Sequence, residues 1–194
     1  MTTSISSLFR LLPACALALG VVAMPVQAEK ADRLKKMEVE SDQPGKVDLQ
    51  NQIVVFNGNV VVTKGTMVIR ANRIEVRESP EGYQTAVAVG SAGNLTGFRQ
   101  KREGVNEFIE GEAERLEYDS KADTIRFINK ASVKRLRGTA VADEVTGALI
   151  TYDNTAEVFT VSGGASAATP TNPTGRVRAV LPVLGHREGL RRQG

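Results

Sequence analysis

Carboxylates are the side chains whose type and spacing come closest to catalytic chemistry in this sequence. Glu110, Glu112 and Glu114 stand at alternate positions, and Glu117 and Asp119 follow. On a strand, alternate residues share one face, and two acids facing a cleft could hydrolyse a polysaccharide. Acids at this spacing are more often a solvated outer face, where ionisation costs nothing. We therefore expect no catalytic residue and no enzyme activity.

Other reactive groups are scarce. The one histidine, His186, lies near the C-terminus, and its isolation removes histidine acid catalysis, Ser-His-Asp arrangements and multi-histidine metal sites. Lys64-Gly65-Thr66 lacks the upstream glycine of a phosphate-binding loop and is typical of a hairpin turn. We expect neither a cofactor nor a metal.

The first 28 residues have the pattern of a cleaved secretory signal. Arg10 precedes an apolar run from Leu11 to Val22, and the predicted cleavage lies between Ala28 and Glu29. The run is shorter than the ~20 residues that a membrane-spanning helix needs. The single cysteine, Cys15, lies inside this signal, so the mature chain has no disulfide and no thiolate metal site. This predicts a periplasmic protein.

Charge is distributed unevenly along the chain. Residues 29–175 carry 19 Lys and Arg against 21 Asp and Glu, whereas residues 176–194 carry five Arg against one Glu. The folded part is slightly acidic and has no basic stripe interleaved with aromatic residues, which argues against nucleic-acid binding. From Ala165 onward, Ala, Thr, Pro, Gly and Arg replace the alternating pattern. We predict a folded domain over residues 29–164 and a flexible basic tail over 165–194.

Apolar and polar residues alternate from Met37 to about Val161, which is the pattern of half-buried strands. Clusters of turn residues recur about every ten residues, as in an all-β sandwich, jelly roll or barrel. The pattern also repeats: Gly58, Gly90, Asn129 and Gly163 occupy matching places in similar segments. A unit of several short strands is therefore expected to stack about four times, leaving unpaired backbone at both ends.

One phase of these strands is rich in Val, Ile, Phe and Tyr, and should face inward. Periodicity alone does not distinguish a filled sandwich core from a groove for a lipid. The predicted inward residues are Met37, Val39, Val54, Phe56, Val60, Val62, Ile69, Ile74, Val76, Phe98, Leu116, Tyr118, Ile125, Phe127, Ile150, Tyr152, Phe159 and Val161.

The stretch LQNQIVVFNGNVVVTKGTMVIRANRIEV, residues 49–76, resembles the signature of the OstA-like family. The pattern is Phe-x-Gly-Asn-Val-x-Val-x-x-Gly-Thr, then Ile-x-Ala-x-x-Ile-x-Val. The resemblance extends over about residues 37–163, and it aligns poorly around Arg99 to Glu107. Asn129-Lys130-Ala131 stands where the family has Gly-Asn-Ala, so that turn could differ in geometry.

The resemblance implies an all-β jelly roll of about sixteen antiparallel strands, open at both ends, that carries lipopolysaccharide across the periplasm. The eighteen inward residues would then line a groove for the acyl chains of lipid A. The implied protein partners are an LptC-like inner-membrane adaptor and an LptD-like outer-membrane translocon. Both would bind by pairing with edge strands, and copies of the chain would associate head to tail.

Two other functions remain open at this point. An adaptor of the same fold normally keeps its N-terminal helix as an anchor, so the cleavable signal favours a carrier. A polysaccharide-acting hydrolase or a sugar-binding module would need two carboxylates facing a cleft.

Overall fold

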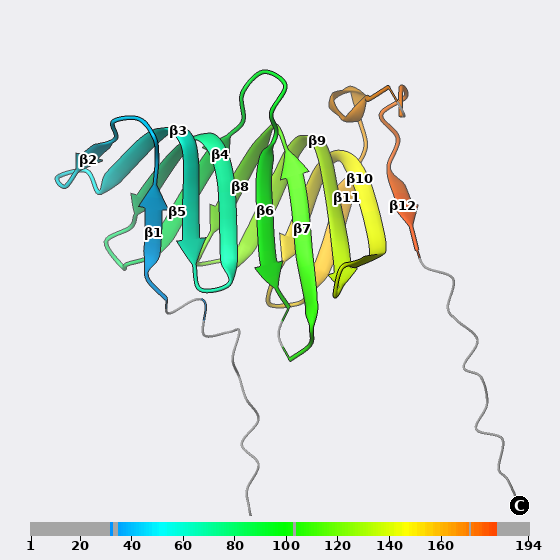
Figure 1. The fold of residues 1–194 in the computed structure, drawn as a ribbon, viewed down its shortest axis with the longest axis horizontal. Coiled ribbons are helices and arrows are strands. Elements are labelled where there is room, and N and C mark those ends of the chain that lie inside the picture. The colour runs from blue at the N-terminus through cyan, green and yellow to red at the C-terminus, as the bar shows by residue number, and fades with distance from the viewer. Residues whose placement is uncertain (1–31, 33–34, 103, 171, 182–194) are drawn as a thin grey trace, which may run out of the picture.

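The computed structural model describes residues 32, 35–102, 104–170 and 172–181. The predicted signal and its cleavage site at Ala28 and Glu29 lie outside these residues. Apart from single turns of 3-10 helix, the regular structure of the described residues is β-strand (Figure 1). The strands are β1 (Met37–Glu40), β2 (Lys46–Asp48), β3 (Ile53–Lys64), β4 (Met67–Glu78), β5 (Gln84–Val89), β6 (Thr96–Lys101), β7 (Glu107–Ala113), β8 (Arg115–Asp119), β9 (Thr124–Arg137), β10 (Ala140–Asp153), β11 (Val158–Ser162) and β12 (Arg178–Val180).

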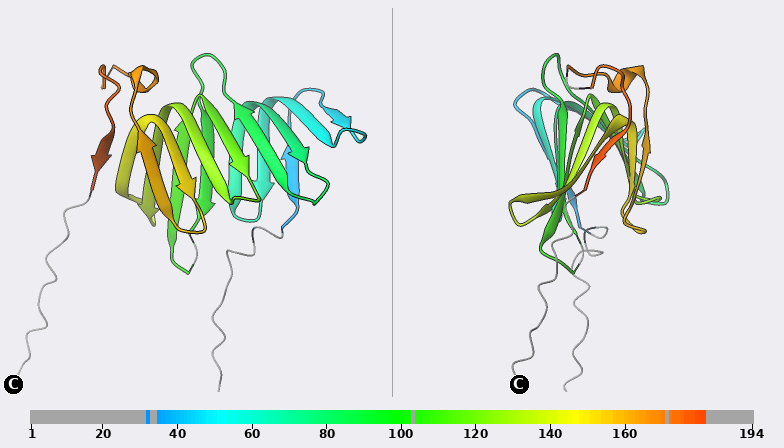
Figure 2. Two further views of the ribbon diagram at one scale, coloured as in Figure 1. Left: turned by 180° about the vertical axis from the view of Figure 1, so that it is seen from behind. Right: turned by 90° about the vertical axis from the view of Figure 1, so that its right-hand side faces the viewer.

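The strands form one antiparallel sheet that folds over on itself into two layers (Figures 1 and 2). Four strands, β3, β4, β9 and β10, are long enough to cross from one layer to the other. Each of them places one half in each layer, and its two halves pair with different neighbouring strands. In Figure 1 the front layer runs from β1 through β6 and β7 to β12, and the back layer runs from β2 through β5 and β8 to β11.

The all-β prediction and the strand number of the jelly roll are both met. The described residues contain twelve continuous strands. When the halves of the four long strands are taken separately, each layer has eight segments, which gives the expected sixteen. The continuous count is lower because the long strands cross between layers without leaving the sheet.

The layers meet along a line of bends, which we call the bend line. On β3 the bend is a bulge at Gly58 and Asn59, with φ of 73° and 45°. On β9 it lies at Asn129 and Lys130, with φ of 63° and 49°. A bulge adds a residue to one strand and bends it sharply, and asparagine tolerates a left-handed backbone better than most residues. Asn129 thus adopts the same left-handed backbone at the bend of β9 as Gly58 does at the bend of β3.

The sequence repeat marks this bend line. The Gly90 amide donates to the Glu114 carbonyl, and the Glu114 amide donates to the Asn129 carbonyl, both at 3.0 Å. Gly163 directly follows β11, whose last residue pairs with Leu149, and Leu149 lies beside the register shift between β9 and β10. The matching Gly and Asn positions are therefore the places where the chain passes from one layer to the other.

The structure differs from the predicted flexible tail in the first part of that segment. A 3-10 helix, η2 (Ala165–Ala167), follows Gly164, and β12 pairs with Glu144–Thr146 of β10. Strand β12 could not be predicted from the sequence, because its three residues are all exposed and show no alternation. The rest of the predicted tail, residues 182–194, lies outside the described residues.

The packing of the two layers predicts effects of very different size for substitution of two glycines in neighbouring strands. A Cβ on Gly111 would lie 2.2 Å from the ring of Phe127, a fully buried residue, whereas a Cβ on Gly97 would meet nothing closer than 3.9 Å. Gly111→Ala should lower the free energy of unfolding by about 1–3 kcal/mol in urea denaturation. The matched control, Gly97→Ala, should change it by less than about 0.5 kcal/mol. Equal effects would contradict the described packing.

Candidate functional site: the groove between the layers

The two layers enclose one apolar interior. All eighteen residues that we predicted to face inward either belong to the buried cluster that fills it or pack against that cluster. Glu117 and Arg126, in the opposite phase, pair with each other at 2.8 Å on the outer face of the back layer. The structure thus confirms the inward phase. Contact of these residues with a lipid stays a prediction.

The centre of this interior is filled by protein side chains. Val60, Val62, Phe127 and Ile150 are fully buried, and the rings of Phe98 and Phe127 form a T-shaped pair with 5.7 Å between centroids. Met37, Val39, Val54, Phe56, Phe159 and Val161 are only partly buried, and they lie toward the two ends of the stack. The central residues therefore form a packed core, and space for a ligand is found at the ends.

The N-terminal end has a cavity of about 160 Å³ beneath β1 and β2. Its apolar wall includes Met37, Val39, Val54 and Val76, which are four of the predicted groove residues. Val47 and Leu49 also line it and are largely exposed to solvent. Apolar side chains in this position suit an apolar partner or ligand.

The C-terminal end has a larger cavity of about 340 Å³, lined by residues of both layers. Tyr152 and Phe159 form its back wall, with stacked rings whose centroids are 4.5 Å apart. Burial, aided by the negative charge of Glu157, raises the pKa of the Tyr152 hydroxyl to about 12, so the ring stays neutral. Ile109, Val133 and Val145 continue the apolar wall in the front layer.

Charged residues form the rim of this C-terminal cavity. Glu107 accepts hydrogen bonds from Arg102, Arg135 and Arg137, the last at 3.0 Å. Burial raises the pKa of the Glu107 carboxyl, but these hydrogen bonds outweigh it and lower the pKa from 4.5 to about 2. Arg135 also pairs with Asp143, and Arg102 pairs with Glu157.

The mouth of the groove is the side opposite the bend line, where the strands of both layers end. Polar side chains bridge it. The Lys64 ammonium, on β3, donates to the Tyr118 hydroxyl, on β8, at 3.5 Å and is itself buried. Arg102 and Glu157 make a second bridge, because Glu157 lies in the turn between β10 and β11 in the back layer. Polar contacts between the layers thus close the mouth at these two places.

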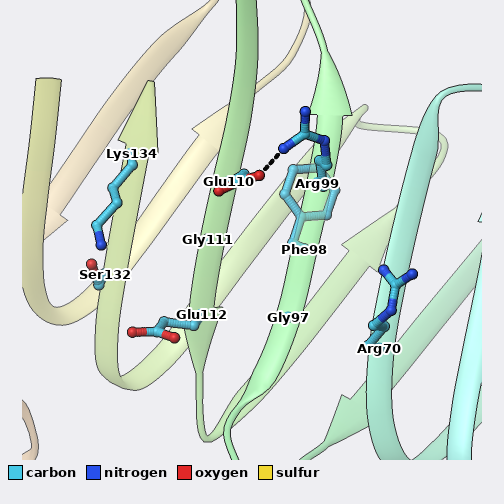
Figure 3. Close-up of a pocket in the computed structure, with 9 residues that line it drawn as sticks. All are labelled: Arg70, Gly97, Phe98, Arg99, Glu110, Gly111, Glu112, Ser132 and Lys134. Carbon is cyan, nitrogen blue, oxygen red and sulfur yellow. Dashed lines mark hydrogen bonds and ion pairs between the residues drawn. The ribbon is translucent and has the colours of Figure 1, made fainter. Parts of the chain in front are cut away.

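A hollow of about 280 Å³ lies on the outer face of the front layer (Figure 3). Glu110 and Glu112, two of the acids that suggested hydrolysis, line it, and Glu110 pairs with Arg99 there. Glu114 pairs with Lys130 at 2.6 Å near the bend line. These acids therefore lie outside the groove, on the solvated side that we predicted for them.

Sequence reasoning missed several residues of the C-terminal cavity. Ile109 shares its alternating phase with Gly111, but it follows the region where the family resemblance is poor. Arg102, Glu107 and Arg135 face each other only once their strands are paired, which alternation along one strand does not reveal. Leu181 is placed at the cavity by β12, a strand that we did not predict.

The described residues contain neither a membrane-spanning helix nor a cluster of metal ligands. None of them belongs to a helix long and apolar enough to cross a bilayer. In the same part of the chain, no group of three or more His, Cys, Asp or Glu side chains is placed to hold a metal ion.

Known proteins of similar sequence show to which family the chain belongs. The family model described as LptA/(LptD N-terminal domain) LPS transport protein matches residues 38–158. The chain belongs to this family. Within the LptA/LptD N-terminal family, it is 28% identical over 129 residues to the lipopolysaccharide export system protein LptA of Escherichia coli K12, covering 66% of this chain and 68% of that protein. LptA of Haemophilus influenzae Rd is also 28% identical, over 126 residues, covering 65% and 69%.

A solved structure shares the fold of this member of the LptA/LptD N-terminal family. It is LptH, the LptA-homologous periplasmic component of the lipopolysaccharide transport device of Pseudomonas aeruginosa. The TM-score is 0.66 at 22% identity, and the match covers 79% of this chain and 99% of LptH.

The arginine cluster around Glu107 predicts a pH-dependent contribution to stability. Because the folded-state pKa is depressed, ionised Glu107 stabilises the fold above about pH 4.5, and this contribution is lost as the pH falls toward 2. Glu107→Gln should lower the free energy of unfolding by about 2–4 kcal/mol at neutral pH. The deficit should shrink as the pH falls, when measured by urea denaturation.

Glu112→Gln is the matched control for this test, because Glu112 lies on the exposed outer face of the same strand. It should leave stability unchanged at every pH. A loss in Glu107→Gln that is as large at the acid end as at neutral pH would contradict the assigned role of the carboxylate.

Proposed function

We propose that the chain is a periplasmic carrier of lipopolysaccharide, which shields the acyl chains of lipid A between its two layers. The observation that carries this proposal is the apolar interior of the folded sheet, with a cavity at each end, in a member of a lipopolysaccharide-transport family. The relatives named above, LptA and LptH, favour the carrier over an LptC-like adaptor.

The physical task of such a carrier is to keep hydrocarbon out of water. Each exposed CH₂ group costs about 0.8 kcal/mol, so several acyl chains crossing the periplasm unshielded would face a barrier of many kcal/mol. An apolar interior that continues from end to end removes this barrier without bond chemistry. The protein therefore acts by shielding, and it needs neither a catalytic residue nor a cofactor.

The open ends of the stack support pairing with partners. β1 is an outer strand at the N-terminal end, and β11 is an outer strand at the C-terminal end. Each can accept another strand by β-augmentation. Joined ends would continue the apolar interior into an LptC-like adaptor, an LptD-like translocon or a second copy of the chain.

Photo-crosslinking tests the carrier role and the position of the lipid. Photoreactive side chains at Val39 and Phe159, which face the end cavities, should capture lipopolysaccharide in cells. The same group at Glu117 or Arg126, on the outer face, should capture none.

A photoreactive group at Phe127, in the filled centre, should capture lipid only if the layers separate. Mass spectrometry of the purified protein should also find a co-purifying glycolipid, and equal capture from inner and outer positions would overturn the proposal.

Edge pairing predicts growth of head-to-tail assemblies with concentration, because a heterologous contact does not close on itself. Light scattering should show rising mass, and proline at Val39 or Phe159 should stop growth by removing a backbone donor. Circular dichroism would verify that each variant keeps its fold. A monomer at every concentration that also fails to bind a partner of the same fold would contradict the bridging role.

A further inference from the structure

The C-terminal cavity has the layout of a site for an amphiphile. Along the inner face of the front layer, Val133 and Val145 pair at one level and Arg135 and Asp143 at the next. Glu107 and Arg137 pair one level closer to the mouth. The wall is thus apolar toward the bend line and charged toward the mouth. An acyl chain fits the first part, and a polar head fits the second.

The charged rim is divided unequally between the layers. Arg102, Arg135 and Arg137 belong to the front layer, as do the carboxylates Glu107 and Asp143. The third carboxylate that pairs with this cluster, Glu157, belongs to the back layer, where it is held with a left-handed backbone at φ 56°. The cluster is neutral while the layers are together. Without Glu157, its front-layer part has three positive and two negative charges.

We propose that the C-terminal mouth binds the phosphate group of the transported lipid, and that Arg102 exchanges Glu157 for this phosphate when the layers separate. This inference rests on the proposed carrier function. Separation removes Glu157 from Arg102, whereas Glu107 and Asp143 stay with the front layer. The front layer then lacks one negative charge at the point where the head group of a lipid would lie.

Arginine suits this exchange because its planar guanidinium can donate two parallel hydrogen bonds to a phosphate. Arg102 is also only partly exposed, with 20% of its side chain accessible, so solvent weakens its interactions less than at an open surface. The same ion pair therefore has two roles in turn. While the layers are together, the pair closes the mouth. When they separate, Arg102 holds the head group.

The test compares three probes: lipid A with its phosphates, dephosphorylated lipid A, and inorganic phosphate alone. The wild-type protein should bind phosphorylated lipid A about tenfold more tightly than the dephosphorylated form. Arg102→Gln should lose this preference and keep its affinity for dephosphorylated lipid A. Arg77→Gln, on the outer face of the back layer, is the matched control and should keep the preference.

Glu157→Gln gives a second test, in the opposite direction. This variant frees Arg102 from its bridge, so it should bind phosphorylated lipid A more tightly than the wild type. A preference that Arg102→Gln and Glu157→Gln both leave unchanged would overturn the inference, as would binding of inorganic phosphate as tight as that of the lipid. Failure of the wild-type protein to bind either lipid would instead overturn the carrier function itself.

Discussion

Exclusion of water from the inward face of a single sheet is the constraint on which this structure depends. Among the described residues, no long helix and no second sheet is present to cover that face. The sheet covers itself by folding along the bend line, where Gly58, Asn59, Asn129 and Lys130 adopt left-handed backbone. The interior, the open ends and the mouth all follow from this one fold.

The same constraint creates a conflict between stability and cargo. A dry interior must be filled to be stable, because empty apolar space forfeits packing energy. The layers fill the centre with their own side chains, and the larger interior cavities described above lie at the two ends. A lipid that occupies the centre must therefore replace contacts between the layers. Polar bridges such as Arg102 with Glu157 suit this exchange, because water can solvate both partners when they part.

Much of this could be predicted from the sequence. The alternation of apolar and polar residues predicted the strands and the residues that face inward, because side chains two positions apart, such as Val60 and Val62, share one face of a strand. The repeat of Gly and Asn gave the stacking unit, and the structure shows that the repeat marks the bend line. The C-terminal strand β12 was missed because Arg178–Val180 is short and exposed. The cluster around Glu107 was missed because it depends on which strands pair, a long-range property.

Entry of lipid by separation of the two layers would change the distance between them at the mouth. Spin labels at Val141 in the front layer and at Ala156 in the back layer report this directly, since both positions are exposed near the C-terminal mouth. The only native cysteine, Cys15, lies in the predicted signal, so labelling can be specific. Double electron–electron resonance should show a longer distance between the labels when lipopolysaccharide is bound. An unchanged distance in protein saturated with lipid would contradict the account.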